Sequence, residues 1–472
     1  MEADLRPPVT APAISPRYKW WVVGMLWFIC FFNYADRQAV YSVFPKLRQE
    51  FGFDPFQLGL IASAFTWIYA AGAPVAGFIG DWLRRKTLIL GGCLFWSAIT
   101  VATAWCGQFW HFVTVRAMEG LGETFYFPAS MSMISDYHSA RTRSRAMSIH
   151  QSSVYVGTIL GSWWGAWFAE HHGWRTGFYF FGLLGVLLVL ALARFLREPV
   201  RGQAETADAL PESRSSGRES AHASTERDQS RLPSAATSGS SAGVVNRPAP
   251  AAAPPTVREV LAEIFRTPTA WVLLGVFVGA NFVATIFLTW TPTFLVEKFN
   301  FKLTAAGLNG SIFIHLASAL SVPLGGALAD RWARRFAGGR MLVQALGLLV
   351  GAGFVFVVGM TRNVHALIGA MAVFGFCKGL YDANIFASVY DVVAPRARAT
   401  AAGVMNFVGW GGGGLGPVVF GWLAQHGRYG NEVANMSHAI AFGAIVYLVG
   451  AALLLVAILF FAPRDVGREA RA

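Results

Sequence analysis

Charged residues are scarce in this chain: Asp, Glu, Lys and Arg make up 14% of its 472 residues, whereas apolar residues make up 54%. Soluble domains contain about 25% charged residues, so the composition excludes a chain built only of soluble domains. Apolar runs of about 20 residues, long enough to cross a bilayer core of about 30 Å, recur along nearly the whole sequence. We therefore expect an integral, multi-pass membrane protein.

Cysteine is also scarce. The four cysteines, Cys30, Cys93, Cys106 and Cys377, stand in apolar runs without paired spacing. They are typical of small buried residues rather than of a disulfide framework or a metal site. The sequence also has no cluster of metal ligands, no recognisable Ser/His/Asp nucleophile turn and no phosphate-binding glycine loop. We therefore expect no enzymatic activity, no cofactor and no metal.

Six apolar segments precede a polar interruption and six follow it. They span about 18–44, 56–80, 86–107, 110–136, 145–170, 175–196, 269–298, 304–329, 340–361, 365–391, 398–424 and 437–462. Each is long enough for a membrane-spanning helix. The expected fold class is an all-α membrane protein of about twelve transmembrane helices in two pseudo-symmetric bundles of six.

The polar interruption at about 199–255 is rich in Ser, Ala, Pro, Gly and Arg. Such a segment buries too little apolar surface to offset its ordering entropy, so we expect a disordered linker. The helical apolar spacing that follows predicts a short helix on the membrane surface. The expected organisation is a tail at 1–17, a first bundle at 18–198, the linker at 199–255, the interfacial helix at 256–267, a second bundle at 268–463 and a tail at 464–472.

The net charge of +12 comes from basic residues that fall in alternate loops, such as Arg84 to Lys86, Arg141 to Arg145 and Arg331 to Arg335. This distribution follows the positive-inside rule and argues against nucleic-acid binding. It predicts a protein of the plasma (inner) membrane whose two termini and linker lie in the cytoplasm. The first 17 residues contain no apolar core, so we expect no cleaved signal peptide.

One sequence motif occurs twice, at the end of an apolar segment in each half of the chain. Pro74, Gly77, Gly80, Asp81 and Arg85 recur, with the same distances from Pro to Gly to Asp, as Pro323, Gly326, Ala329, Asp330 and Arg334. Farther along, Asp136 followed by Arg141 and Arg143 recurs as Asp391 followed by Arg396 and Arg398. Duplicated membrane halves are typical of secondary transporters, and these two halves have parallel orientation.

These motifs resemble the major facilitator superfamily, and the likeness covers the chain outside the linker and the tails. Gly77-x-x-Gly80-Asp81-x-x-x-Arg85 looks like the superfamily turn between the second and third helices. Arg116-x-x-x-Gly120-x-Gly122 looks like its fourth-helix motif. The resemblance implies two six-helix bundles that work by alternating access.

Within the superfamily, three strings resemble the anion:cation symporters, which import organic carboxylates such as sugar acids with protons. They are Asn33-Tyr34-Ala35-Asp36-Arg37, then Gly122-Glu123 followed by Phe127-Pro128-Ala129, and Trp290-Thr291-Pro292-Thr293-Phe294-Leu295. The first two also occur in Spinster-like lipid transporters, so both branches stay open. The fifth segment has Gly157, Gly161 and Gly165 without the Gly-Pro pair of many drug/proton antiporters, which disfavours an exporter.

Four ionisable residues lie well inside the first and fourth segments: Asp36, Arg37, Arg116 and Glu123. Such a residue costs about 2.5–3.5 kcal/mol at the centre of a spanning helix, so it indicates a functional site. At about 1.5 Å per residue, Asp36 and Arg116 fall at similar depth and can pair. Burial favours a protonated carboxyl and a nearby guanidinium favours an ionised one, so these groups can exchange a proton.

The roles that we predict are Asp36 and Glu123 as proton carriers, Arg116 as the charge that favours the ionised acid, and Arg37 as the ligand of the substrate carboxylate or the partner of Asp36. The alternative is a static network that fixes helix packing. Nine further residues are candidate substrate ligands: Asn33, Tyr34, Tyr41, Asn281, Thr285, Trp290, Lys378, Asp382 and Asn406. The alternative is that they only make ordinary contacts between helices. His315 is a further titratable residue in the eighth segment.

A second set of residues predicts a conformational gate. Gly80, Asp81, Arg85, Asp330 and Arg334 lie at the inner ends of helices, where ion pairs between the halves can hold one state closed. The sequence thus predicts a monomeric secondary transporter in the lipid bilayer, with a small organic anion and a proton as its partners. The alternatives are a Spinster-like, proton-coupled carrier of lysolipid or another amphiphile, and an exporter of small organic molecules.

Overall fold

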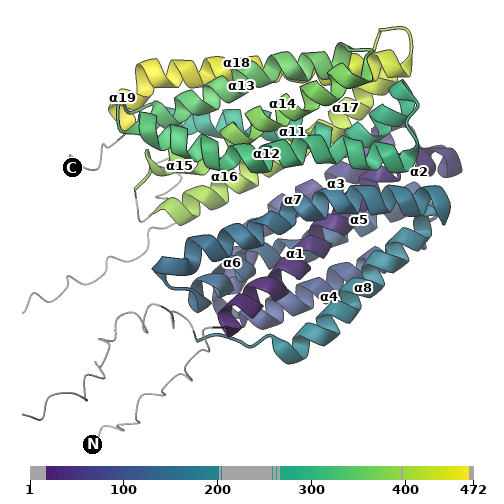
Figure 1. Cartoon of the computed structure of the whole chain (residues 1–472), viewed down its shortest axis with the longest axis horizontal. Helices are drawn as coiled ribbons and strands as arrows, with labels where there is room; N and C mark the ends of the chain where they lie inside the picture. The colour runs from purple at the N-terminus through teal and green to yellow at the C-terminus, as the bar shows by residue number, and fades with distance from the viewer. Residues whose placement is uncertain are drawn as a thin grey trace, which may run out of the picture.

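The computed structural model describes residues 17–200, 266–394 and 397–466, together with Ala204, Arg258 and Ala262. The helices in this part of the chain form two bundles that lie side by side (Figure 1). Most of the predicted linker, the interfacial helix and the two tails lie outside the described residues. Those domain boundaries therefore stay predictions.

The first bundle contains six spans, the fourth of which is broken into α5 and α6. Its helices are α1 (Tyr18–Ser42), α2 (Phe44–Phe51), α3 (Pro55–Trp82), α4 (Arg85–Thr103), α5 (Phe109–Thr124), α6 (Tyr126–Tyr137), α7 (Ala140–His171) and α8 (Trp174–Phe195). The short helix α2 follows α1 and was not predicted. It is not a span.

The second bundle repeats this plan, with two broken spans. Its helices are α11 (Pro268–Phe299), α12 (Leu303–Ala333), α13 (Gly339–Met360), α14 (Val364–Asp382), α15 (Ile385–Tyr390), α16 (Arg398–Gly413), α17 (Leu415–His426), α18 (Glu432–Val456), η2 (Ala457–Phe461) and α19 (Ala462–Asp465). The predicted all-α fold of twelve spans in two six-helix bundles is confirmed. Most of the predicted span limits fall within a few residues of these helices.

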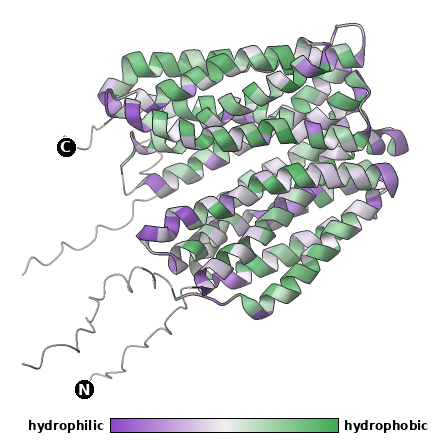
Figure 2. Cartoon of the chain, in the orientation of Figure 1, coloured by the Kyte–Doolittle hydropathy of each residue, from purple (hydrophilic) through white to green (hydrophobic). Residues whose placement is uncertain are grey.

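Within the described part of the chain, eight helical segments are long and apolar enough to cross a membrane by length and composition alone. The other four spans do not meet this criterion. Two of them are broken into short helices, α5 with α6 and α16 with α17, and the other two, α1 and α7, carry many polar residues. Figure 2 shows hydrophobic residues along the lengths of the helices and hydrophilic residues gathered at their ends. This pattern fits a bilayer around both bundles.

The ends of the helices define two ends of the molecule. We call the end where α1 begins and α8 ends the terminal end, since the Tyr18 hydroxyl donates to Phe195 O there at 2.7 Å. The opposite end, which we call the far end, contains α2, the start of α3 and the start of α18 (Figure 1). Asp54 and Gln57 form a capping box that begins α3 at this end.

Glycine residues set the position of α1. Gly157, Gly161 and Gly165 of α7 lie against the backbone of α1, and a Cβ added at Gly161 would fall 2.3 Å from the Cα and O of Ala35. Only glycine permits this approach, because any side chain would overlap backbone atoms. The seam therefore holds α1 against α7 next to Asp36 and Arg37.

Two prolines inside helices release carbonyl groups that other helices bind. Pro292 cannot donate to Leu288 O, and the Gln38 amide of α1 donates to that oxygen instead at 2.8 Å. Pro417 likewise leaves Gly413 O free, and the Thr285 hydroxyl donates to it at 2.7 Å. The first of these contacts joins the two bundles beside Arg37.

The bundles touch each other closely at the far end. Ser162 of α7 donates to Gly307 O of α12 at 2.7 Å, and Glu170 accepts from the backbone N–H of Thr304 at 2.7 Å. Arg48 of α2 forms an ion pair with Glu432 of α18 in which its Nη2 donates to Oε2 at 2.6 Å. These contacts close the far end in this conformation.

Candidate functional site

Five ionisable side chains meet inside the first bundle. Asp36 and Arg37 come from α1, and Arg116, Glu119 and Glu123 come from α5. All five are buried, with at most 6% of their surface exposed. We call this set the charge cluster.

Arg37 and Glu123 join α1 to α5. The Nε of Arg37 donates to Oε2 of Glu123 at 3.0 Å, and its Nη2 binds the same oxygen. The guanidinium carbon lies over the rings of Phe65 and Tyr34, 4.4 and 4.6 Å from their centroids, and Tyr69 lies 5.3 Å away. These rings stabilise the cation on its faces by cation–π interactions.

Arg116 and Glu119 form the second ion pair, one turn apart on α5. The Nη2 of Arg116 also donates to the Tyr41 hydroxyl at 3.2 Å, and Phe65 lies against this guanidinium too, with its centroid 4.6 Å away. Phe65 therefore separates two buried cations. Nothing of the Arg116 side chain is exposed.

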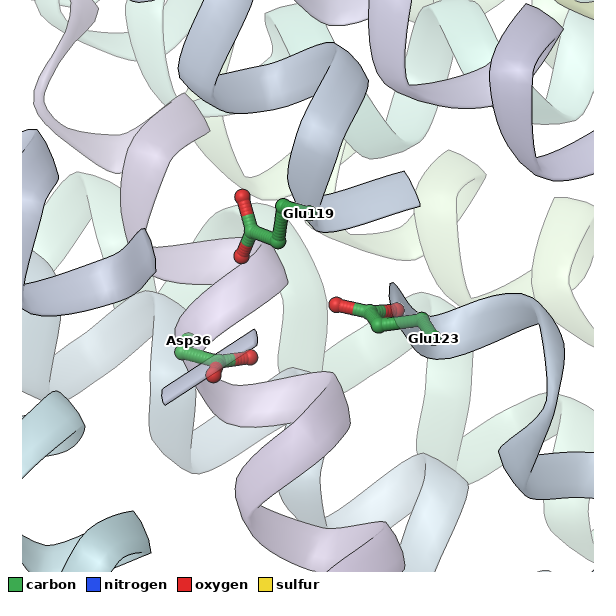
Figure 3. A group of neighbouring side chains, drawn as sticks. All are labelled: Asp36, Glu119 and Glu123. Atoms are coloured by element: carbon green, nitrogen blue, oxygen red, sulfur yellow. The ribbon is translucent and has the colours of Figure 1, made fainter. Parts of the chain in front are cut away.

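Asp36 is the carboxylate with no guanidinium partner among the described side chains. Its Oδ1 accepts from the backbone N–H of Arg37 at 2.7 Å, and its Oδ2 accepts from the Thr100 hydroxyl at 3.2 Å. Figure 3 shows its carboxylate turned toward those of Glu119 and Glu123. One oxygen from each of the three lies within 4.8 Å of the others.

The cluster thus holds three carboxylates and two guanidinium groups. If all five are ionised, its net charge is −1, and a buried uncompensated charge costs several kcal/mol. One bound cation, such as a proton, makes the cluster neutral. Oε1 of Glu123 is buried and has no hydrogen-bond partner among the described residues, so an acceptor is available for that proton.

The observed pairs differ from the expected ones. Asp36 and Arg116 were predicted to lie at similar depth, where they could pair, but Arg116 binds Glu119. Of the two roles predicted for Arg37, that of a partner of Asp36 is not seen, because its side chain binds Glu123. Glu119 was not a predicted site residue. Its spacing of three residues from Arg116 was the available signal, because residues at i and i+3 are neighbours on a helix.

A pocket between the bundles borders the charge cluster. Its first-bundle side contains Arg37, Tyr41 and Tyr69, and its second-bundle side contains Thr289 and Trp410. Arg37 uses Nε and Nη2 on Glu123, whereas Nη1 makes no hydrogen bond to a described residue and is not enclosed. This nitrogen is therefore available to a ligand.

The remaining predicted ligands of the first bundle are Asn33, Tyr34 and Tyr41, and Tyr41 lines the pocket itself. Tyr34 and Tyr41 contact the two guanidinium groups, as described above. Asn33 is buried, and its Nδ2 has no hydrogen-bond partner among the described residues. The structure thus brings Asn33, Tyr34 and Tyr41 together with the charge cluster.

In the second bundle, several predicted ligands have structural partners. Thr285 donates to Gly413 O, the fully buried Trp290 donates to Pro417 O at 3.0 Å, and Asn281 donates to Phe277 O at 2.9 Å within its own helix. Asn406 is half-buried on α16. Lys378 and Asp382 form an ion pair on α14, away from the charge cluster but partly exposed.

The predicted gate residues lie at the terminal end. Arg85 forms an ion pair with Asp136, and Arg340 pairs with Asp330 and Asp391, the closest atoms being 2.8 and 3.0 Å apart. Each of these pairs lies within one bundle, not between the bundles as expected of a closed gate. Arg334 is exposed, and for Gly80 and Asp81 the structure describes only the backbone.

Curated proteins of similar sequence include two kinds of transporter. The chain is 27% identical over 443 residues to sodium-dependent phosphate transport protein 1 of Arabidopsis thaliana, covering 92% of this chain and 78% of that one. It is 24% identical to the probable galactarate/D-glucarate transporter GudP of Escherichia coli, covering 86% and 87%. It is also 35% identical to human protein spinster homolog 1, over 42% of this chain and 38% of that one.

Among solved structures, a bacterial homolog of the human lysosomal transporter Spinster, in an inward-facing and unoccupied conformation, superposes with a TM-score of 0.72. It covers 97% of this chain and 99% of that one at 20% identity, which establishes the fold alone. The family model described as Major Facilitator Superfamily matches residues 26–417 and 295–472. The chain belongs to the Major Facilitator Superfamily and is a multi-pass membrane transporter.

Proposed function

We propose that this protein is a proton-coupled symporter of a small organic anion, a sugar acid or a similar carboxylate. It works by alternating access in the inner membrane, with its terminal end in the cytoplasm. The basic residues of alternate loops support this orientation, since those loops meet at the terminal end.

One observation carries the proposal: the charge cluster has one more carboxylate than guanidinium groups. A buried site of this kind gains a proton to become neutral. Guanidinium groups bind one oxygen of Glu119 and one of Glu123, so the cluster lacks a single positive charge, which a proton supplies and a divalent metal ion would exceed. Asp36 and Glu123 are the carriers that we assign.

Arg37 is the anion ligand in this proposal. Its free Nη1 borders the pocket, and an arriving carboxylate competes with Glu123 for the same guanidinium. A proton on the carboxylates weakens their hold on Arg37. Proton binding therefore raises the affinity for the anion, and by linkage the anion raises the affinity for the proton.

Alternating access requires contacts that break. The far-end contacts of Arg48, Glu170 and Ser162 would separate in the opposite state, and so would the Gln38 bond to Leu288 O beside Arg37. Because Gln38 is next to Arg37 on α1, loading of the site and separation of the bundles act on the same segment. The terminal-end charges, which pair within each bundle in this structure, would pair between the bundles in that state.

The test uses the purified protein in liposomes with an inward proton gradient and no sodium. We expect accumulation of at least one acid from a panel of sugar acids, aromatic acids and dicarboxylates, abolished by a protonophore. Asp36→Asn should lose accumulation and keep exchange of labelled substrate, because its cluster is neutral without a proton. If no acid accumulates, or if the driving ion is sodium, the proposal is wrong.

A Spinster-like carrier of lysolipid or another amphiphile is the second candidate. It is favoured by the 35% identity over 201 residues to human protein spinster homolog 1. The same liposomes distinguish it, since lysolipid would move between leaflets under a proton gradient while none of the acids accumulates.

A further inference from the structure

A second group of polar side chains lies at the boundary between the bundles, outside the charge cluster. It contains Tyr155 of α7, His315 of α12, and Lys378 and Asp382 of α14. The rings of Tyr155 and His315 meet edge to face with centroids 6.4 Å apart. Lys378 and Asp382 form an ion pair on α14. Gly375 and Gly379 of α14 lie against Ile314 and Ser318 of α12, which brings this ion pair beside the turn of α12 that carries His315. We call these four residues the polar wall.

The tautomer of His315 follows from its hydrogen bond. Its Nδ1 lies 2.8 Å from Ser311 O, and a carbonyl oxygen only accepts, so Nδ1 carries the hydrogen. In the neutral imidazole only one ring nitrogen carries a hydrogen, and the other is an acceptor. Nε2 is therefore an acceptor. It makes no hydrogen bond to a described residue and is not enclosed.

The other members of the polar wall supply both donors and acceptors. Lys378 uses one N–H on Oδ2 of Asp382 and keeps two, while Oδ1 of Asp382 has no described partner. The side chains of Lys378 and Asp382 are 24% and 35% exposed, so they reach solvent. Their charges cancel. A neutral surface of alternating donors and acceptors suits hydroxyl groups, which both donate and accept.

We propose that the polar wall binds the hydroxyl groups of the transported anion, and that His315 Nε2 is the acceptor that selects hydroxylated carboxylates over plain ones. The inference rests on the proposed function, in which Arg37 binds the carboxylate from the first bundle. One end of the ligand is thus recognised by charge and the rest by hydrogen bonds. An acceptor that faces a methylene group instead stays unpaired, which lowers the affinity for the plain acid.

The experiment compares D-glucarate with adipate, the six-carbon dicarboxylate without hydroxyl groups. Their dissociation constants are measured by calorimetry on the full-length protein in nanodiscs, for the wild type, His315→Phe and His438→Phe. Phenylalanine keeps the ring that contacts Tyr155 and removes the acceptor. His438 is the matched control, since its Nδ1 also bonds a carbonyl one turn back, Ala434 O at 2.8 Å, but its ring stacks on Tyr429 in the second bundle.

We expect the wild type to bind D-glucarate at least 10-fold more tightly than adipate. His315→Phe should weaken D-glucarate binding about 5- to 10-fold, the value of one hydrogen bond, and leave adipate unchanged. His438→Phe should change neither. Equal losses for both acids in His315→Phe, an unchanged ratio, or a wild type that binds neither acid would each overturn the inference. Selective binding without proton-driven uptake in liposomes would contradict the proposed function alone.

Discussion

The Nε of Arg37 lies 3.0 Å from Oε2 of Glu123, inside a bundle where neither side chain is exposed by more than 8%. Nη2 of the same guanidinium binds the same oxygen, and the rings of Tyr34 and Phe65 cover its faces. The pair holds α1 to α5 while Nη1 remains available at the pocket. One arginine thus has a structural partner and a free donor at once.

Arg37→Lys should lower proton-driven uptake about 10- to 100-fold, because an ammonium group cannot bind Glu123 through two nitrogens and also face the pocket. The measurement is initial uptake into liposomes. Arg175→Lys is the matched control: Arg175 also pairs with a glutamate, Glu50, and lies over a ring, that of Trp174, but it is 40% exposed. Equal losses in both variants would mean that the geometry of Arg37 has no special role.

Glu119→Gln should destabilise the protein more than Asp36→Asn. The first change leaves the fully buried Arg116 without its carboxylate, at a cost of about 1–3 kcal/mol, whereas the second removes the surplus acid. Thermal unfolding of the purified variants in detergent measures the difference. A lower melting temperature for Asp36→Asn than for Glu119→Gln would contradict the pairing of the cluster.

The sequence was sufficient to predict the fold because the information is local. Apolar runs and polar loops mark the spans, and Asp54, Asn363 and Asn431 cap the helices that they precede. The helix α2 was missed because eight residues with mixed polarity give no span signal. The breaks beside Pro128 and Pro417 follow from the missing proline N–H, yet a pattern of apolar residues does not reveal them.

The charge cluster could be predicted in its members but not in its pairs. Depth along a helix follows from counting residues, which placed Asp36 level with Arg116. Rotation of each helix about its axis depends on distant packing, such as Gly161 against Ala35, and this rotation decides which partner a side chain meets. Glu119 was overlooked for this reason. Thr285 lines the pocket, so its predicted role as a ligand stays a prediction, but its bond to Gly413 O could not be foreseen, since that oxygen is released by a proline more than a hundred residues away.

Arg48→Ala should shift the protein toward the state with an open far end. The ion pair of Arg48 with Glu432 is about one-third exposed, so its loss should change the ratio of the two states only about 2- to 5-fold. Spin-label distances between α2 and α18 measure this ratio. The exchanged pair, Arg48→Glu with Glu432→Arg, should restore the closed far end, and a failure to restore it would argue against the ion pair as the cause.

Gly161→Ala should destabilise the first bundle, because the new methyl group would fall 2.3 Å from the Cα and O of Ala35 and must push α1 away from α7. Overpacking of this kind costs about 1–3 kcal/mol, which thermal unfolding in detergent detects. The displacement should also lower uptake, since α1 carries Asp36 and Arg37 into the charge cluster.

Gly369→Ala is the control for this last change. Gly369 lies inside α14 with nothing within 4 Å of the position of an added Cβ, so alanine there should be neutral or stabilise the helix by up to about 1 kcal/mol. The two variants introduce the same methyl group and the same gain in helix propensity. A difference between them therefore reports the α1 and α7 seam alone, and equal melting temperatures would show that this close approach does not hold α1 in place.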